Sequence, residues 1–249
     1  MPTFARGDTS IHYEVYGTGY PILLFAPGGL RSSIPFWDKT PFHPVRELST
    51  QFQIIAMDQR NAGQSRAPIH GTDGWATYTA DHVALLDHLG IANCHLLGGC
   101  IGGAFGLALA SVAPSRISAA VLQQPIGLGG DNRPLFQQAF DGWAEELVKE
   151  RPELDRAALA GLKNNLYASD FAFSVSREDV RRTPVSLLVL RGNDPYHPPE
   201  ISEEIVRIAP RAELVASWKE GEDLARAVAR VKAFLSINTP RDDPPMSRR

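Results

Sequence analysis

The sequence predicts an α/β domain built on a doubly wound, mostly parallel β-sheet, and three observations lead to this fold class. Short apolar runs recur along the chain, and such runs are typical of strands that are covered on both faces, as in parallel sheets. Segments with the apolar spacing of helices lie between these runs, so strand and helix alternate. One long segment, residues 127–183, contains helical patterns but no strand pattern and interrupts this alternation.

The strand patterns fall at residues 10–16, 22–26, 52–57, 94–97, 117–122, 185–190 and 212–215. The helical patterns fall at residues 78–89, 102–112, 201–208 and 224–235 and, inside the strand-free segment, at 134–149, 154–167 and 170–182. An insertion at the carboxyl edge of a parallel sheet is well placed to cover a ligand site. We therefore expect a core of residues 1–126 and 184–238, a helical cap or lid of residues 127–183, and a flexible tail of residues 239–249.

Length and composition fit one compact domain with a small-molecule substrate. The chain has 249 residues, of which 43% are apolar and 21% are charged, and its net charge is −3. This balance provides no basic surface for nucleic acid or for an acidic membrane. The apolar runs are too short to span a bilayer, and the start of the chain lacks the pattern of a secretory signal. We expect a cytoplasmic protein, with a homodimer as one compatible state.

The sharpest local signal is the turn at residues 96–103, Leu-Leu-Gly-Gly-Cys-Ile-Gly-Gly. A strand that turns at once into a helix thrusts one side chain out at the bend, and its neighbours must be small because strand and helix are pressed together there. Gly98 and Gly102 meet this demand around Cys100. The positive end of the helix also favours a thiolate. Cys100 is therefore the candidate nucleophile, whereas Cys94, in mid-strand, is interpreted as a buried thiol too distant for a disulfide.

These motifs resemble the α/β-hydrolase fold family over nearly the whole chain. The strand before Pro27-Gly28-Gly29 is similar to the strand and oxyanion loop of that family, and residues 58–65 are similar to its Asp-x-Arg-Gly-x-Gly-x-Ser turn, with Asn61 in place of a glycine. Residues 98–103 resemble its nucleophile elbow, with Cys100 where most relatives carry serine. The resemblance implies an α/β-hydrolase fold with a helical lid and a cysteine nucleophile.

The resemblance also assigns the groups that would assist Cys100. The backbone N–H of Ile101 and that of Gly29, with Leu30 as the next choice, would form an oxyanion hole. Asp194, after the strand at 185–190, would be the acid of a triad. The histidine that the family places after its last strand is absent, because no histidine follows His197.

Three assignments of the base therefore stay open. His197 lies three residues after Asp194 in a proline-rich loop at the expected active edge, and it is the preferred base. His70 is the second choice, in the loop after the turn at 58–65. The third choice is no histidine base at all, since a thiolate needs less help than a serine hydroxyl.

Residues near the same edge suggest how a substrate is held. Leu30, Gln124 and Trp143 are candidates for substrate contacts, Gln124 because it follows a strand and Trp143 because it belongs to the aromatic residues of the lid. No cluster of His, Cys and Asp has the spacing of a metal site, and no cofactor is expected.

The preferred function is hydrolysis of a carboxylic ester, thioester or lactone through an acyl-cysteine, as the resemblance to cysteine-using dienelactone hydrolases implies. Two alternatives remain. An acyltransferase would use the same cysteine, since the Gly-x-Cys-x-Gly-Gly box also resembles that of polyhydroxyalkanoate synthases. A non-catalytic ligand-binding protein on this fold would explain the missing late histidine.

Overall fold

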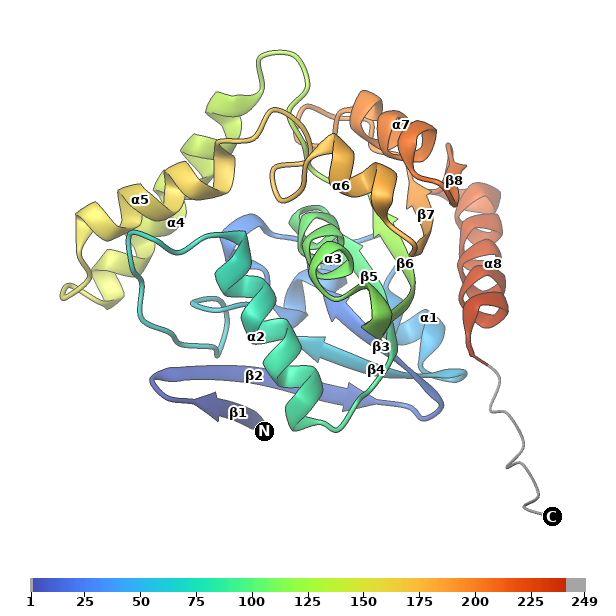
Figure 1. The fold of residues 1–249 in the computed structure, drawn as a ribbon, viewed down its shortest axis with the longest axis horizontal. Coiled ribbons are helices and arrows are strands. Elements are labelled where there is room, and N and C mark those ends of the chain that lie inside the picture. Colours follow the sequence, from blue (N-terminus) through green and yellow to red (C-terminus); the bar gives the residue numbers. More distant parts are fainter. Residues whose placement is uncertain (1, 241–249) are drawn as a thin grey trace.

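The computed structural model describes residues 2–240, in which eight strands form one twisted sheet (Figure 1). The strand order is β1-β2-β4-β3-β5-β6-β7-β8. The β1–β2 and β2–β4 pairs are antiparallel, and all other pairs are parallel. The strands are β1 (Thr3–Arg6), β2 (Thr9–Tyr16), β3 (Tyr20–Phe25), β4 (Phe52–Met57), β5 (Cys94–Gly99), β6 (Ile117–Gln123), β7 (Ser186–Leu190) and β8 (Ala212–Val215). The predicted fold class is confirmed.

Helices cover both faces of the sheet, which explains why the central strands are mostly apolar. The helices of the core are α1 (Pro44–Leu48), α2 (Trp75–His88), α3 (Ile101–Val112), α7 (Pro199–Ile208) and α8 (Gly221–Asn238). Along β3, Leu23 and Phe25 pack in one hydrophobic cluster with residues of α2 and α3, and Ile22 and Leu24 pack in a second cluster with residues of α1 and α8. Side chains of a strand alternate between its two faces, so both faces of this sheet are dry.

The segment between β6 and β7 is helical within the described residues, as predicted. It holds α4 (Arg133–Glu150), α5 (Arg156–Tyr167) and α6 (Arg177–Arg182). The α4 and α5 helices pack together beyond the sheet, at the upper left of Figure 1, whereas α6 returns to α3 and α7. The division into core and cap residues remains a prediction. Thr239 and Pro240 end the described part of the predicted tail, and residues 241–249 lie outside it.

The helix predicted at residues 170–182 is wrong in its first half. Residues 170–175 form bends, and Phe173 has a φ of +57°, which no helix accommodates. Phe171 and Phe173 are buried in the main hydrophobic cluster. The helix begins only after Ser176, whose hydroxyl accepts a hydrogen bond from the Asp179 N–H at 3.1 Å. Burial of two aromatic rings and a strong N-cap therefore override the local helical pattern.

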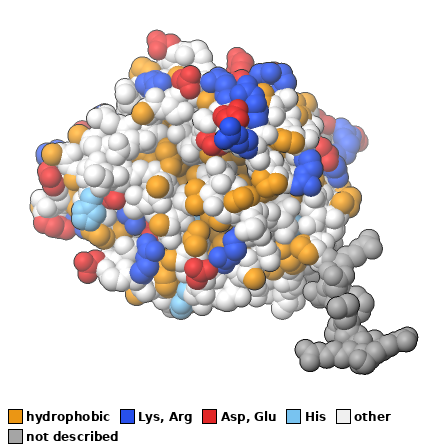
Figure 2. Space-filling view, in the orientation of Figure 1, with side chains coloured by type: hydrophobic (Ala, Val, Ile, Leu, Met, Phe, Trp, Pro, Cys, Tyr) orange, Lys and Arg blue, Asp and Glu red, His pale blue; other side chains and the backbone are white. Residues whose placement is uncertain are grey.

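The surface carries charges of both signs. Blue and red side chains alternate around α6 and α7 in Figure 2, where Arg177 pairs with Glu204 and Arg182 pairs with Glu178. Within residues 2–240, no helix combines the length and the hydrophobicity needed to cross a lipid bilayer. Cys94 and Cys100 are both free thiols, in agreement with the expectation of no disulfide.

Candidate active site

Cys100 lies at the bend between β5 and α3 with a strained backbone. Its φ of +57° and ψ of −119° fall where a residue with a side chain costs free energy, on the order of 1–3 kcal/mol. Three backbone hydrogen bonds hold the bend. The Cys100 N–H donates to the Gln123 carbonyl at 2.9 Å, and the Cys100 carbonyl accepts from the Gly103 N–H at 3.0 Å and from the Ile126 N–H at 3.4 Å. Pairing with β6 and the first turn of α3 thus fix the position of the thiol.

The glycines around Cys100 are required by close packing, as predicted. A Cβ on Gly98 would lie 2.0 Å from the Gly102 carbonyl oxygen, and a Cβ on Gly102 would lie 2.0 Å from the Phe25 carbonyl oxygen. Both distances are far below van der Waals contact, and both neighbours are backbone atoms. Strand β3, strand β5 and helix α3 therefore meet without side chains directly beneath the thiol.

Asp194 and His197 form a carboxylate–imidazole pair within one short loop. Nδ1 of His197 lies 2.8 Å from both carboxylate oxygens of Asp194. The same carboxylate accepts from the backbone N–H groups of Tyr196 at 3.0 Å and His197 at 3.1 Å. Gly192 permits the fold-back, because a Cβ there would lie 2.2 Å from the His197 carbonyl oxygen. Nε2 of His197 is buried, and within the described residues no partner lies at full hydrogen-bond geometry to it.

The electrostatic balance favours a thiolate beside an imidazolium. Burial raises the pKa of the Cys100 thiol, but the His197 imidazole and the backbone N–H groups of Ile101 and Gly28 outweigh it, so the pKa lies below its usual value. Burial lowers the pKa of His197, but Cys100 and Asp194 outweigh it and raise the pKa. The hydrogen bonds with His197 likewise keep the pKa of Asp194 low against its burial. Such pairing is how cysteine nucleophiles are activated.

We expect iodoacetamide to alkylate Cys100 rapidly at neutral pH, with a rate that falls only as the pH drops through the lowered thiol pKa. The thiolate is the reactive form, and an ordinary thiol with a pKa of about 8.5 is largely protonated at pH 7. In His197→Ala the cation is gone and burial acts unopposed, so the rate at pH 7 should fall at least about tenfold, because one pKa unit changes the thiolate fraction tenfold. Mass-resolved labelling against pH measures both profiles.

Cys94 provides an internal control for this labelling. Burial raises its pKa to about 12, so it should react only after unfolding. Identical alkylation profiles for the wild type and His197→Ala would contradict the electrostatic coupling of His197 and Cys100.

Cys100 and His197 face a common cavity of about 250 Å³. Its walls come from the loop after β3, the start of α3, helices α4 and α5, and the loop after β7. The lining is mainly apolar and includes Leu30, Ile101, Ile126, Phe136, Phe140, Tyr167 and Tyr196. A water molecule occupies about 30 Å³ in the liquid, so the cavity holds roughly eight groups of that size. The site can accommodate a small, partly apolar ligand.

Most of the residues predicted from the sequence meet at this cavity, and two do not. Cys100, His197, Gly29, Leu30 and Ile101 line it, and Asp194 stands behind His197. Trp143 instead packs against Phe140 with ring centroids 5.2 Å apart, and it lines a separate surface hollow. Gln124 has a φ of +43° and an unpartnered buried Oε1, and it does not belong to the cavity wall.

The segment after β8, where the resemblance would place a histidine, carries a buried tryptophan. After β8 the chain buries Trp218, whose indole N–H donates to the Arg191 carbonyl at 2.9 Å. His70, the second choice for the base, is exposed and lies outside the cavity wall. The structure therefore brings His197, and not His70, to the thiol.

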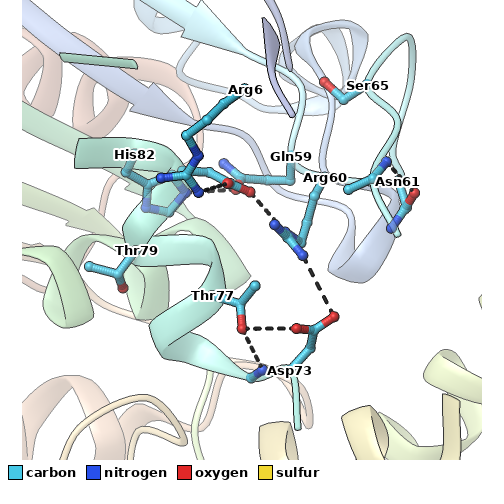
Figure 3. A network of polar contacts seen from close by, with 12 residues as sticks. Arg6, Gln59, Arg60, Asn61, Ser65, Asp73, Thr77, Thr79 and His82 are labelled. Carbon is cyan, nitrogen blue, oxygen red and sulfur yellow. Dashed lines mark hydrogen bonds and ion pairs between the residues drawn. The ribbon is translucent and has the colours of Figure 1, made fainter. Parts of the chain in front are cut away.

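A buried polar cluster joins the turn at residues 58–65 to α2 and the residue before it (Figure 3). Arg60, on this turn, donates to Asp81 at 2.8 Å and lies 3.6 Å from Asp73, and all three side chains are buried. On the same turn, Asp58 accepts from the Ile34 N–H at 2.7 Å, and the Gln59 N–H donates to the Ser32 carbonyl at 3.0 Å. Ion pairs inside the protein thus brace the turn at residues 58–65, which in turn fixes the loop after β3.

Three residues at the site were not among those singled out from the sequence. The Gly28 N–H acts on the thiol together with that of Ile101, while the assignment of Gly29 to an oxyanion hole remains a prediction. Arg31 belongs to the cavity wall, and its guanidinium pairs with Glu146 of α4 at 2.8 Å. Tyr167, at the end of α5, adds a phenol to the wall. Gly28 stands beside Gly29 in the same turn and Tyr167 is one of the aromatic residues of the predicted lid, so both had a sequence signal, whereas Arg31 had none.

The family description alpha/beta hydrolase fold matches residues 21–203, which includes the elbow and the Asp194–His197 loop. The chain belongs to this family. Among solved α/β-hydrolase folds, the meta-cleavage product hydrolase from Pseudomonas fluorescens IP01 has a TM-score of 0.72 at 19% identity and covers 96% of this chain and 98% of that one. The enol-lactonase from Burkholderia xenovorans LB400 has a TM-score of 0.70 at 21% identity and covers 94% and 100%. These likenesses confirm the fold.

Several curated proteins are also similar to this chain in sequence. A putative carbamate hydrolase RutD from Azorhizobium caulinodans is 33% identical over 47% of this chain and 42% of its own length. One from Stutzerimonas stutzeri is 24% identical over 86% of this chain and 83% of its own length. The first match thus spans less than half of that relative.

Proposed function

We propose that the chain is a hydrolase that cleaves a carboxylic ester, thioester or lactone through an acyl intermediate on Cys100. The observation that carries the proposal is the thiol at a strained bend, facing a cavity that it shares with His197. Asp194 holds His197 from behind at 2.8 Å. The three groups have the order of a nucleophile, a base and an orienting acid, which is the arrangement that activates a nucleophile in this kind of chemistry.

The proposed reaction has two steps. The thiolate attacks the carbonyl carbon and forms a C–S bond, and the negative oxygen is bound by the N–H of Ile101 and by a second N–H from Gly28 or Gly29. The C–O or C–S bond to the leaving group then breaks, and His197 gives that group its proton. In the second step His197 takes a proton from water, the resulting hydroxide displaces the thiolate, and the carboxylic acid departs. Asp194 stabilises the imidazolium throughout.

The names of the relatives support hydrolysis without identifying the substrate. Carbamate hydrolase, meta-cleavage product hydrolase and enol-lactonase are the names of proteins similar to this one. The cap segment, residues 127–183, contributes Phe136, Phe140 and Tyr167 to the cavity. We infer that it serves as a lid that excludes water and limits the size of the acyl group.

Intact mass spectrometry after brief exposure to a panel of para-nitrophenyl esters tests the proposal. We expect the wild type to gain the mass of one acyl group, located on Cys100 by peptide mapping, and to lose it again as water attacks. His197→Ala should acylate more slowly and should retain the adduct for longer, because both steps use His197. Cys100→Ala should gain no mass, and Cys94 should stay unmodified.

The alternatives give different results in the same experiment. An acyltransferase would yield mainly the transferred product when an alcohol or a thiol is added, with little free acid. A binding protein would form no adduct with any ester, and Cys100→Ala would bind a ligand of the cavity as tightly as the wild type. Either result would refute hydrolysis through an acyl-cysteine.

A further inference from the structure

Tyr167 is a polar group in the cavity wall for which the proposed reaction has no use. Its side chain is 5% exposed, and it lines the cavity together with Cys100. Its ring is fixed by Phe136, Phe140 and Phe173, with centroids at 5.8, 6.4 and 5.3 Å. Within residues 2–240 no hydrogen bond to its hydroxyl is found, and the hydroxyl is not among the fully enclosed polar atoms that lack a partner. The phenol is thus rigidly held and accessible at the cavity wall.

A ligand that fills an apolar site closes its polar groups off from water, and a hydroxyl left without a partner there costs on the order of 1–3 kcal/mol. Two buried tryptophan rings show the pairing that avoids this cost. The indole N–H of Trp75 donates to the Leu166 carbonyl at 3.0 Å, and that of Trp218 donates to the Arg191 carbonyl at 2.9 Å. Because Tyr167 lines the cavity, an acceptor atom of a bound ligand can reach its hydroxyl from there.

The Tyr167 hydroxyl is a hydrogen-bond donor, and it is not one of the groups that stabilise the Cys100 thiolate. Burial, followed by the charge of the nearby Cys100, raises the pKa of Tyr167, so the phenol keeps its proton at any working pH. The groups that lower the pKa of Cys100 are His197 and the N–H groups of Ile101 and Gly28, and Tyr167 is not among them. The phenolic proton is therefore free for a substrate atom close to Cys100.

We propose that Tyr167 donates a hydrogen bond to a second acceptor atom on the acyl part of the substrate. The protein would then prefer small acyl groups that carry an oxo or hydroxyl oxygen beyond the reacting carbonyl. This inference rests on the proposed function. In the proposed reaction, backbone N–H groups bind the reacting carbonyl oxygen. The leaving group lies near His197, from which it receives its proton. Tyr167 stands on the cap wall with Phe140, so the acyl chain is the part left to meet it.

The inference is tested with two pairs of para-nitrophenyl esters, pentanoate against its β-oxo and γ-oxo derivatives, on the wild type and Tyr167→Phe. The leaving group is constant, so only the acyl acceptor changes. We expect Tyr167→Phe to lower kcat/KM for at least one oxo ester about tenfold, equivalent to about 1.4 kcal/mol, and to leave the pentanoate within about twofold. A site with a buried donor discriminates in this way against a ligand that lacks the acceptor.

Two further measurements separate a substrate contact from a structural role. The acyl group remains bound after the leaving group departs, so Tyr167→Phe should slow both acylation and release of the oxo acid in stopped-flow traces. The pH profile of Cys100 alkylation should not change. Tyr20→Phe is the matched control, because it removes a phenol at the opposite end of β3, where the hydroxyl bonds Ser118 at 2.6 Å. This control should preserve the ratio between the esters.

Equal losses on plain and oxo esters, or no loss on either, would overturn the role of Tyr167 while leaving acyl-cysteine hydrolysis intact. Slower acylation with unchanged release would place the contact on the leaving group and would also overturn the inference. If the wild type forms no acyl-Cys100 with any of these esters, the proposed function itself fails, and the inference fails with it.

Discussion

Replacing Cys100 with alanine should lower kcat/KM for an activated ester by at least about 10⁴-fold, because loss of a covalent nucleophile has effects of this size or larger in comparable enzymes. The variant retains the proposed oxyanion donors and the cavity. Any remaining rate therefore comes from binding of the ester and from polarisation of its carbonyl group alone. The fold should be preserved, since the side chain is only partly buried and faces the cavity. Steady-state release of para-nitrophenol under reducing conditions measures the effect, and circular dichroism verifies folding.

Two control variants make this result specific. Cys94→Ala removes the other thiol, which is fully buried in β5, and it should retain activity. Cys100→Ser keeps a nucleophile whose pKa is far higher than that of a thiol, and it should be slowed strongly because a hydroxyl depends on its base. Activity of Cys100→Ala within tenfold of the wild type would show that the chemistry does not pass through this residue.

Gly102→Ala should lower the free energy of unfolding by at least about 3 kcal/mol, a loss that marks severe steric conflict. The new methyl group would lie 2.0 Å from the Phe25 carbonyl oxygen, and neither β3 nor α3 can retreat, because both lie in the closely packed interior. Any displacement would also move Cys100, so activity and stability should fall together. Urea denaturation followed by tryptophan fluorescence gives the change in midpoint.

Gly106→Ala is the matched control for this substitution. Gly106 lies in the same helix, but a Cβ there would make an ordinary contact with the Leu122 side chain at 3.7 Å. Alanine is favoured over glycine in a helix interior by roughly 1 kcal/mol, so this variant should be as stable as the wild type or more stable. Equal destabilisation of the two variants would show that helix packing in general, and not the tight elbow, sets the requirement.

The fold could be predicted because the central strands are buried on both faces. Residues 52–57 are predicted with the bounds that the structure has, since a mostly apolar run between turn residues leaves little ambiguity. The bounds of residues 212–215 also match, although β8 is only partly buried. The edge strand Thr3–Arg6 has no such pattern and is mostly exposed, so it was missed. Strand and helix signals that come from burial are thus visible in the sequence, whereas those that come from pairing at an edge are not.

The candidate site could be predicted where function depends on local geometry. Cys100 is indicated by the tight turn from strand to helix, Asp194 by the resemblance to the family, and His197 by its spacing from Asp194. The sequence does not show which face of a cap helix points inward, so Trp143 was expected to contact the substrate but lines a different hollow. Tyr167 was counted among the lid aromatics, and only the tertiary structure shows that it lines the cavity. The choice between Gly28 and Gly29 depends on backbone angles that neighbouring glycines leave free.

The proposed acid and base, Asp194 and His197, lie within one hexapeptide, residues 192–197, that is folded back on itself. Ordering so short a loop costs far less chain entropy than docking a histidine from the far end of the sheet, because closure entropy grows with the length of the loop. The two groups are therefore gained, lost or transplanted together. The segment after the last strand, β8, then contributes no residue to the proposed reaction. It can lengthen, shorten or bind a partner without changing the proposed proton transfer by His197.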